Sequence, residues 1–333
     1  MGLNHVRWCR WSSATMVVLF TLLAGVAASA CSGGNSGSRP DSENGSPPAL
    51  RVVVSTTVIA DWVAQVGGDA VEVSALVPLG ADAHTVQLTP RDVIQLAAAD
   101  LIVLSGAGLE AGFRAVIAEN TEAPVLDLAA GLDLNSALDQ EASDTDRVDP
   151  HYWLDAGHAI AAVALIAQAL GSQAPALASD FGDRATTFRD LISAADEEIA
   201  GRLRALTDPQ RTLVTFHDAF GYFARRYDLE ILGFVVEGPE EEPSAKDIAN
   251  LVAAMRERGA RVIFTEPQFS ARVVEQVANE TDATIRILHS QLSEAAPTYL
   301  ALLRANAAAL TDAQTETTTN TLSSEPAADK DSL

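Results

Sequence analysis

Short runs of apolar and β-branched residues alternate with helical patterns between residues 49 and 310. In each half of this region, four such runs are separated by segments whose apolar residues recur three and four positions apart. The runs lie at 51–55, 71–77, 100–105 and 124–128, and then at 212–216, 229–236, 261–265 and 284–288. Strands that alternate with helices predict parallel sheets covered on both faces. We therefore expect an α/β fold with two lobes, at 49–170 and 209–310, each with a four-stranded, mainly parallel sheet flanked by helices.

A long helical pattern without strand character separates the two halves. Its apolar residues recur at spacings of three and four from Leu177 to Leu206, Pro175 suits a first helical turn, and Asp208-Pro209 marks an end. About thirty residues at 1.5 Å each extend for roughly 45 Å. We expect residues 171–208 to form one rigid helix that joins the lobes and limits their closure.

The two ends of the chain have the sequence patterns of a signal peptide, a tether and a tail. Residues 1–30 begin with Arg7 and Arg10 and continue as an apolar run, which is typical of a signal peptide and short for a membrane span. Cys31 follows Ala-Ser-Ala, as in a bacterial lipobox, so we expect a lipid on Cys31; the alternative is ordinary cleavage beside an incidental cysteine. Residues 31–48 are rich in Gly, Ser and Pro and predict a disordered tether, and 311–333 predict a disordered acidic tail.

Composition narrows the range of partners. The 333 residues include 45 acidic and 22 basic side chains, for a net charge of −23. This balance argues against nucleic acid, because phosphate binding needs clustered cations. Both cysteines, Cys9 and Cys31, precede the predicted lobes, so neither a disulfide framework nor a cysteine zinc site is expected there. We expect a monomer.

Four histidines lie where predicted strands end or helices begin. His84 follows the strand at 71–77, His217 follows the strand at 212–216, and His289 follows the strand at 284–288. His151 precedes a helix that starts near Asp155. Ligands of open parallel sheets bind outside the carboxyl ends of the strands, so these loops converge if the lobes face each other. Three imidazoles and one oxygen would suit a tetrahedral ion such as Zn²⁺. On the residues alone, capping or surface roles remain the alternative for each histidine.

Four stretches resemble the metal-binding lipoproteins of zinc and manganese ABC importers, the cluster A-I solute-binding family. They are 77–84 (VPLGADAH), 149–155 (DPHYWLD), 216–227 (FHDAFGYFARRY) and 264–269 (FTEPQF). The resemblance implies a C-clamp of two α/β lobes, a rigid spanning helix and one divalent cation between the lobes. It also implies that His84 and His151 are first-lobe ligands and that His217 is a second-lobe ligand.

The fourth ligand departs from the family pattern. Many members carry Asp or Glu in the loop after the last strand, and here Gln291 falls nearest to that place. Gln291 is the expected fourth ligand, with His289, Glu294 and water as competitors. The loop at 135–148 is acidic and lacks the histidines of many zinc-specific members. It is either a solvated loop or a weak collector of cations.

We expect the protein to capture a divalent transition metal outside the membrane and to deliver it to an ABC permease. The expected ion is Zn²⁺, with Mn²⁺ as the alternative. Three imidazoles favour Zn²⁺, whereas Mn²⁺ usually recruits more carboxylate oxygen. One alternative is a surface adhesin whose metal stabilises the fold. Another is a zinc hydrolase, for which Glu266 or Glu294 would be the general base.

Overall fold

The first lobe is built on one parallel sheet. In the computed structural model, which describes residues 49–134, 148–239 and 241–322, its four strands lie in the order β2-β1-β3-β4. The strands are β1 (Leu50–Val54), β2 (Val71–Ala75), β3 (Leu101–Leu104) and β4 (Val125–Asp127). The helices that accompany them are α1 (Thr57–Gly67), α2 (Pro90–Ala98), α3 (Arg114–Asn120) and α4 (Ala156–Gln173). The predicted four-stranded parallel sheet of this lobe is confirmed.

Side-chain caps fix where the first helices begin. The hydroxyl of Thr56 accepts from the amide of Ile59 at the start of α1. Thr89 and Asp92 form a capping box around Pro90 at the start of α2. Such caps provide hydrogen-bond partners for amides that have none inside the helix. Local residues therefore fix where the chain enters α1 after β1 and where it enters α2 before β3.

The second lobe contains the four expected strands in a different pairing. They are β5 (Thr212–His217), β6 (Glu230–Val236), β7 (Val262–Thr265) and β8 (Thr284–Ile287), with helices α6 (Gly221–Arg226), α7 (Ala245–Arg258) and α8 (Arg272–Thr281). Hydrogen bonds join β5 to β6 and β7 to β8, both in parallel, and β5 lies beside β7. The α/β class is confirmed, but the expectation of one continuous four-stranded sheet is wrong in this lobe. The register of β5 with β6 shifts between Leu213 and Val214, and such irregularities bend a strand out of a regular ladder.

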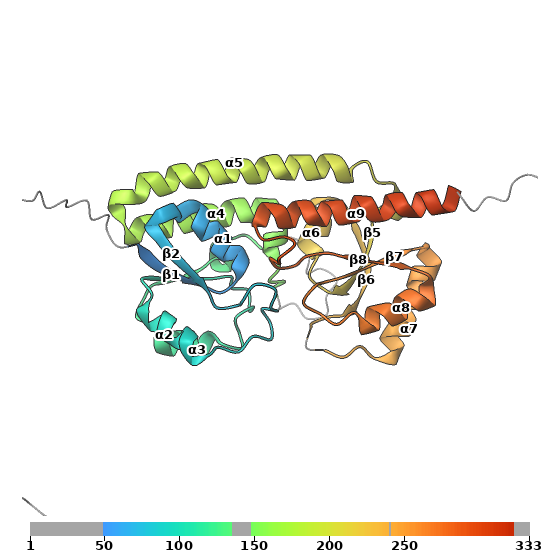
Figure 1. The fold of residues 1–333 in the computed structure, drawn as a ribbon, viewed down its shortest axis with the longest axis horizontal. Coiled ribbons are helices and arrows are strands. Elements are labelled where there is room, and N and C mark those ends of the chain that lie inside the picture. The colour runs from blue at the N-terminus through green and yellow to red at the C-terminus, as the bar shows by residue number, and fades with distance from the viewer. Residues whose placement is uncertain (1–48, 135–147, 240, 323–333) are drawn as a thin grey trace, which may run out of the picture. The chain divides into compact units, whose positions relative to one another are not determined.

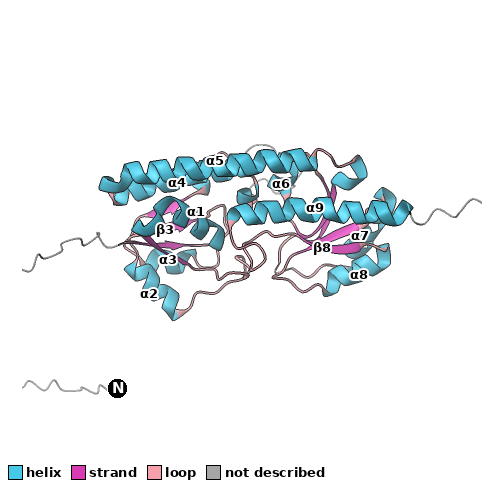
Figure 2. Cartoon of the chain, turned by 45° about the horizontal axis from the view of Figure 1, so that its top comes forward, coloured by secondary structure: helices cyan, strands magenta, loops and turns pink. Residues whose placement is uncertain are grey.

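Two long helices lie on one side of the molecule: the first runs along the first lobe and reaches the second, and the other begins near α1 and runs over the second lobe (Figures 1 and 2). They are α5 (Ala178–Leu203) and α9 (Tyr299–Leu322). The 26 residues of α5 extend for about 39 Å, and the helix packs against α1, α4 and α9. The helical segment expected at 171–208 is therefore shorter than its sequence pattern, because α4 runs to Gln173 and a short 3₁₀ turn, Pro175–Leu177, separates it from α5.

Helix α9 overturns part of the prediction for the C-terminal tail. Residues 311–322, expected to be disordered, continue the helix. Polar composition misled the prediction because helix formation is cooperative, so a segment of weak helix formers can extend a helix that packing has already nucleated. The signal peptide with Cys31, the tether, the acidic loop at 135–147 and the tail at 323–333 lie outside the described residues.

The hydrophobic core continues from one lobe into the other on the side of the long helices. A single cluster includes Val103 of β3, Trp153 next to α4, and Phe220 and Phe223 at α6. A smaller, separate cluster lies between β6, β7, α7 and α8 and includes Val235, Met255, Ile263 and Val277. Much of the second lobe is thus joined to the first by shared apolar packing, while its outer part has a core of its own.

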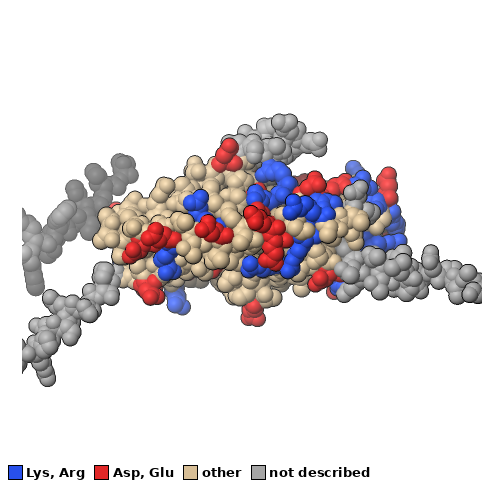
Figure 3. Space-filling model, turned by 90° about the horizontal axis from the view of Figure 1, so that it is seen from above, with Lys and Arg blue, Asp and Glu red and all other residues tan. Residues whose placement is uncertain are grey.

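Charged side chains of both signs lie side by side over the α5 and α9 face (Figure 3). Glu198 of α5 pairs with Arg202 at 2.9 Å and with Arg304 of α9 at 3.1 Å. Exposed pairs of this kind contribute little to stability. Among the described residues, α4 alone is long and apolar enough to cross a membrane, and its buried stripe against α1 and α5 is that of a core helix.

Candidate metal centre

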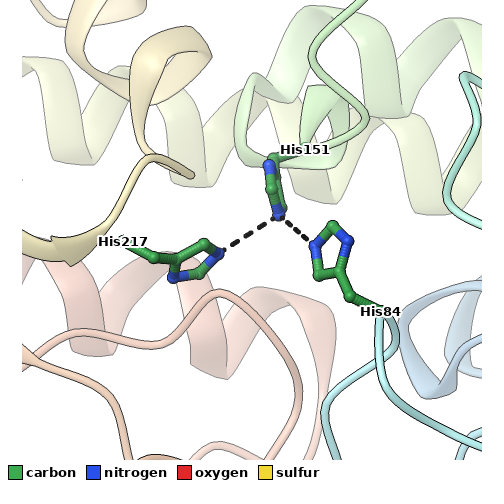
Figure 4. A group of neighbouring side chains, drawn as sticks. All are labelled: His84, His151 and His217. Carbon is green, nitrogen blue, oxygen red and sulfur yellow. Dashed lines mark hydrogen bonds between the residues drawn. The ribbon is translucent and has the colours of Figure 1, made fainter. Parts of the chain in front are cut away.

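Three histidine side chains from separate parts of the chain meet at one point (Figure 4). His84 lies in the loop after β2, His151 precedes the 3₁₀ turn Tyr152–Leu154, and His217 is the last residue of β5. Nε2 of His151 lies 3.2 Å from Nε2 of His84 and 3.4 Å from Nε2 of His217. One nitrogen from each ring lies within 4.8 Å of the others, and His151 and His217 are buried. The structure therefore brings together the three histidines that the sequence predicted.

Carboxylates fix the tautomers of two of these rings. Nδ1 of His151 lies 2.7 Å from Oδ1 of Asp149, and Nδ1 of His217 lies 2.5 Å from Oε1 of Glu266. An ionised carboxylate only accepts hydrogen bonds, so both Nδ1 atoms donate and both Nε2 atoms present a lone pair. Metal-binding histidines are commonly oriented by carboxylates in this way.

The electrostatics of the centre suit a cation. Burial, with the neighbouring ring of His151, lowers the pKa of His84 from 6.5 to about 4, so this ring is neutral at neutral pH. Burial opposes a charge on His151, but the Asp149 carboxylate outweighs it and raises the pKa of His151. Lone pairs that face one another at 3.2–3.4 Å repel unless a proton or a metal ion lies between them. Tetrahedral Zn²⁺ with bonds of about 2.05 Å places its nitrogen ligands about 3.3 Å apart, which matches these two separations.

The candidates for a fourth ligand differ in their surroundings. Gln291 is buried, and its Oε1 atom has no hydrogen-bond partner among the described residues. Nδ1 of His289 lies 3.1 Å from the hydroxyl of Ser293, and the main chain of His289 is bound by Asn306. Glu294 is exposed. A buried amide oxygen without a partner costs free energy, so Gln291 has an acceptor to offer to a ligand.

Sequence reasoning missed the role of Glu266. We considered this residue only as a general base, yet it is buried with Oε1 on His217 and with Oε2 accepting from Gln268 and Ser290. Its position directly after β7, the strand beside β5, was the available signal. Asp149 both caps its loop and orients a ligand candidate, because its Oδ1 accepts from the main-chain amide and from the ring of His151.

Known proteins are similar to this chain in sequence and in fold. Residues 52–313 match the family described as "ZnuA: Zinc-uptake complex component A periplasmic". The iron-binding protein YfeA of Yersinia pestis is 28% identical over 259 residues, which cover 76% of this chain and 83% of YfeA. The metal ABC transporter substrate-binding lipoprotein ScbA of Streptococcus cristatus is 28% identical over 275 residues, 80% of this chain and 86% of ScbA.

A solved structure agrees with the two-lobed arrangement. The crystal structure of a zinc-bound ZnuA deletion mutant superposes with a TM-score of 0.72 and 29% identity, and the match covers 80% of this chain and 98% of that one. The family match spans well over half of the sequence and includes all three clustered histidines. The chain therefore belongs to the ZnuA family of metal-binding, substrate-binding proteins of ABC transporters.

Proposed function

We propose that this protein captures Zn²⁺ outside the cytoplasmic membrane and delivers it to an ABC permease, with His84, His151 and His217 as ligands. The observation that carries the proposal is the meeting of their three ring nitrogens within 4.8 Å. With Nδ1 of His151 and His217 committed to carboxylates, Nε2 is the nitrogen that each ring can offer to a metal ion.

The donor set supports Zn²⁺ over Mn²⁺. Three imidazole nitrogens suit a borderline ion, whereas Mn²⁺ prefers carboxylate, carbonyl and water oxygens. We propose the amide oxygen of Gln291 as the fourth ligand, supported by its burial and its lack of a partner among the described residues. Both general-base candidates of a hydrolase are poorly suited, since Glu266 is engaged through both oxygens and Glu294 is exposed.

The same proposal includes attachment to the membrane. Cys31 follows a signal-peptide pattern and precedes a Gly/Ser/Pro-rich stretch that would act as a tether. A lipid on Cys31 would keep the monomeric protein close to the permease. Metabolic labelling with a radioactive fatty acid tests this part, because the label should be absent from Cys31→Ala.

Titration of the metal-free full chain with Zn²⁺, in competition with a chromophoric chelator, tests the function. We expect one Zn²⁺ per chain with Kd below micromolar, weaker binding of Mn²⁺, and loss of high affinity in His84→Ala, His151→Ala and His217→Ala. His158→Gln is the matched control, because His158 packs beside Tyr152 and Tyr222 rather than in the cluster. Binding of Zn²⁺ no tighter than micromolar in the unaltered chain would reject the proposal.

A further inference from the structure

A chain of hydrogen bonds connects the two lobes beside the metal centre. The indole Nε1 of Trp153 donates to the carbonyl oxygen of Ser290 at 2.7 Å, and the hydroxyl of Ser290 donates to Oε2 of Glu266. Oε1 of Glu266 accepts from Nδ1 of His217 at 2.5 Å. Trp153 belongs to the first lobe, and the other three residues follow or end β8, β7 and β5. We call Trp153, Ser290, Glu266 and His217 the interlobe chain.

The interlobe chain is buried and its hydrogen bonds have a defined direction. Its four side chains are at most 2% exposed. Nε2 of Gln268 donates to Oε2 of Glu266 and to the hydroxyl of Ser290, each at 3.0 Å. Because this hydroxyl already accepts from Gln268, its own proton points to Glu266. A broken link would leave a buried polar group without a partner, which is costly in the interior.

Trp153 is held firmly to the first-lobe ligand His151. Trp153 lies in the 3₁₀ turn that His151 precedes, and the amide of Leu154 in this turn donates to the carbonyl of His151 at 3.1 Å. The rings of Trp153 and His151 make an edge contact, with centroids 5.3 Å apart. The hydroxyl of Tyr299, at the start of α9, donates to the carbonyl of Trp153 at 2.7 Å. A displacement of Ser290 from Trp153 is therefore a displacement of the second-lobe loops from His151.

We propose that Trp153 and Ser290 are positioning residues that set the rate of metal release. While the Trp153–Ser290 bond is intact, Ser290 holds Glu266, and Glu266 holds the ring of His217 toward His84 and His151. When the bond opens, the second-lobe loops separate from the first lobe and His217 loses its fixed orientation. This inference rests on the proposed function, because it treats the three histidines as ligands.

Two conservative variants of the full chain test the inference. Trp153→Phe removes the indole donor and keeps an aromatic ring beside His151, while Ser290→Ala removes the hydroxyl and keeps the carbonyl that accepts from Trp153. Trp62→Phe is the control for the first, since Trp62 is fully buried and its Nε1 has no hydrogen-bond partner among the described residues. Thr281→Val is the control for the second, since it removes a buried hydroxyl that donates within α8 at 2.8 Å.

The measurement is the release of Zn²⁺ from the loaded protein into excess chelator, followed by stopped flow, together with the association rate and the melting temperature of the metal-free chain. We expect each interlobe variant to release Zn²⁺ at least about tenfold faster, as for other residues that orient metal ligands, with little change in association. The double variant should release it no more than about twofold faster than the faster single variant, because the two links act in series. Both controls should release Zn²⁺ at the original rate.

The outcomes separate the inference from the proposed function. If the unaltered chain does not retain Zn²⁺, both fail. A second outcome overturns only the inference. In it, the unaltered chain retains Zn²⁺ and His217→Ala does not, but Trp153→Phe and Ser290→Ala release Zn²⁺ as slowly as their controls. A lower melting temperature with unchanged release would assign the two residues a purely structural role, and effects that multiply in the double variant would refute a serial chain.

Discussion

The Asp149 carboxylate offers a quantitative test of how the centre attracts a cation. Its Oδ1 lies 2.7 Å from Nδ1 of His151, and its side chain is 22% exposed. A metal ion on Nε2 of the same ring would lie about 7 Å from this charge, when the width of the ring and a metal–nitrogen bond of about 2 Å are added. Asp149→Asn removes the charge but keeps an oxygen that can accept from Nδ1, so it isolates the Coulombic contribution.

The size of that contribution follows from Coulomb's law. For charges of +2 and −1 about 7 Å apart, an effective dielectric constant of about 40 to 80 gives about 1 to 2.5 kcal/mol. We therefore expect Asp149→Asn to weaken Zn²⁺ binding about five- to seventyfold. Asp149→Ala should weaken it further, because the ring then also loses the partner that fixes its tautomer.

The assay is competition with a chromophoric chelator at constant ionic strength, on metal-free full chain. Asp69→Asn is the control for net charge, because Asp69 is exposed and precedes β2 at the end of the sheet away from the histidines. Higher salt should reduce the difference between Asp149→Asn and the unaltered chain, since a partly exposed charge is screened. Equal affinities for the unaltered chain, Asp149→Asn and Asp149→Ala would refute the reasoning and leave Asp149 as a loop cap.

Three further predictions concern the same centre. Zn²⁺ at one hundred times its Kd should stabilise the chain by about 2.7 kcal/mol, seen as a rise in melting temperature that His84→Ala abolishes. Gln291→Glu should tighten Zn²⁺ binding and Gln291→Ala should weaken it in the competition assay, because carboxylate is a better donor than amide; no change in either variant would exclude Gln291 as a ligand. Zn²⁺ binding should tighten as pH rises through the raised pKa of His151, because the ion must displace a proton from this ring. His84, with its pKa lowered to about 4, is already neutral and should release no proton. Calorimetry in buffers of different ionisation enthalpy should detect the proton that His151 releases.

The position of the histidines could be predicted from the sequence because strand ends are local features. His217 ends β5, and the carboxyl ends of parallel strands share one edge of a sheet. The pattern of apolar positions and the turn residues that flank it identify such strands, without knowledge of which strands lie beside them in the sheet. The α/β class and the cluster of three histidines followed from these local patterns together with the family resemblance.

The partners of those histidines could not be predicted, because they depend on the order of strands in space. Glu266 is 49 residues from His217, and Ser290 is 137 residues from Trp153. Their contacts arise because β5 lies beside β7 and because the β8 loop reaches the first lobe. Periodicity does not encode either fact. Trp153 is buried in the core, and its indole nitrogen also makes a specific interlobe bond.

The distribution of apolar packing indicates how such a centre can release its ion without wide opening of the lobes. The larger hydrophobic cluster extends through α4, α5, α6 and α9, so separating the lobes on that side would expose a continuous core. Metal–ligand bonds tolerate only a few tenths of an ångström, so a shift of about 1 Å by one histidine is enough to break coordination. The loops that carry Glu266 and Ser290 follow strands that also face the smaller cluster at α7 and α8. A small displacement there, on the side of the Trp153–Ser290 bond, would free the ion while the shared core stays intact.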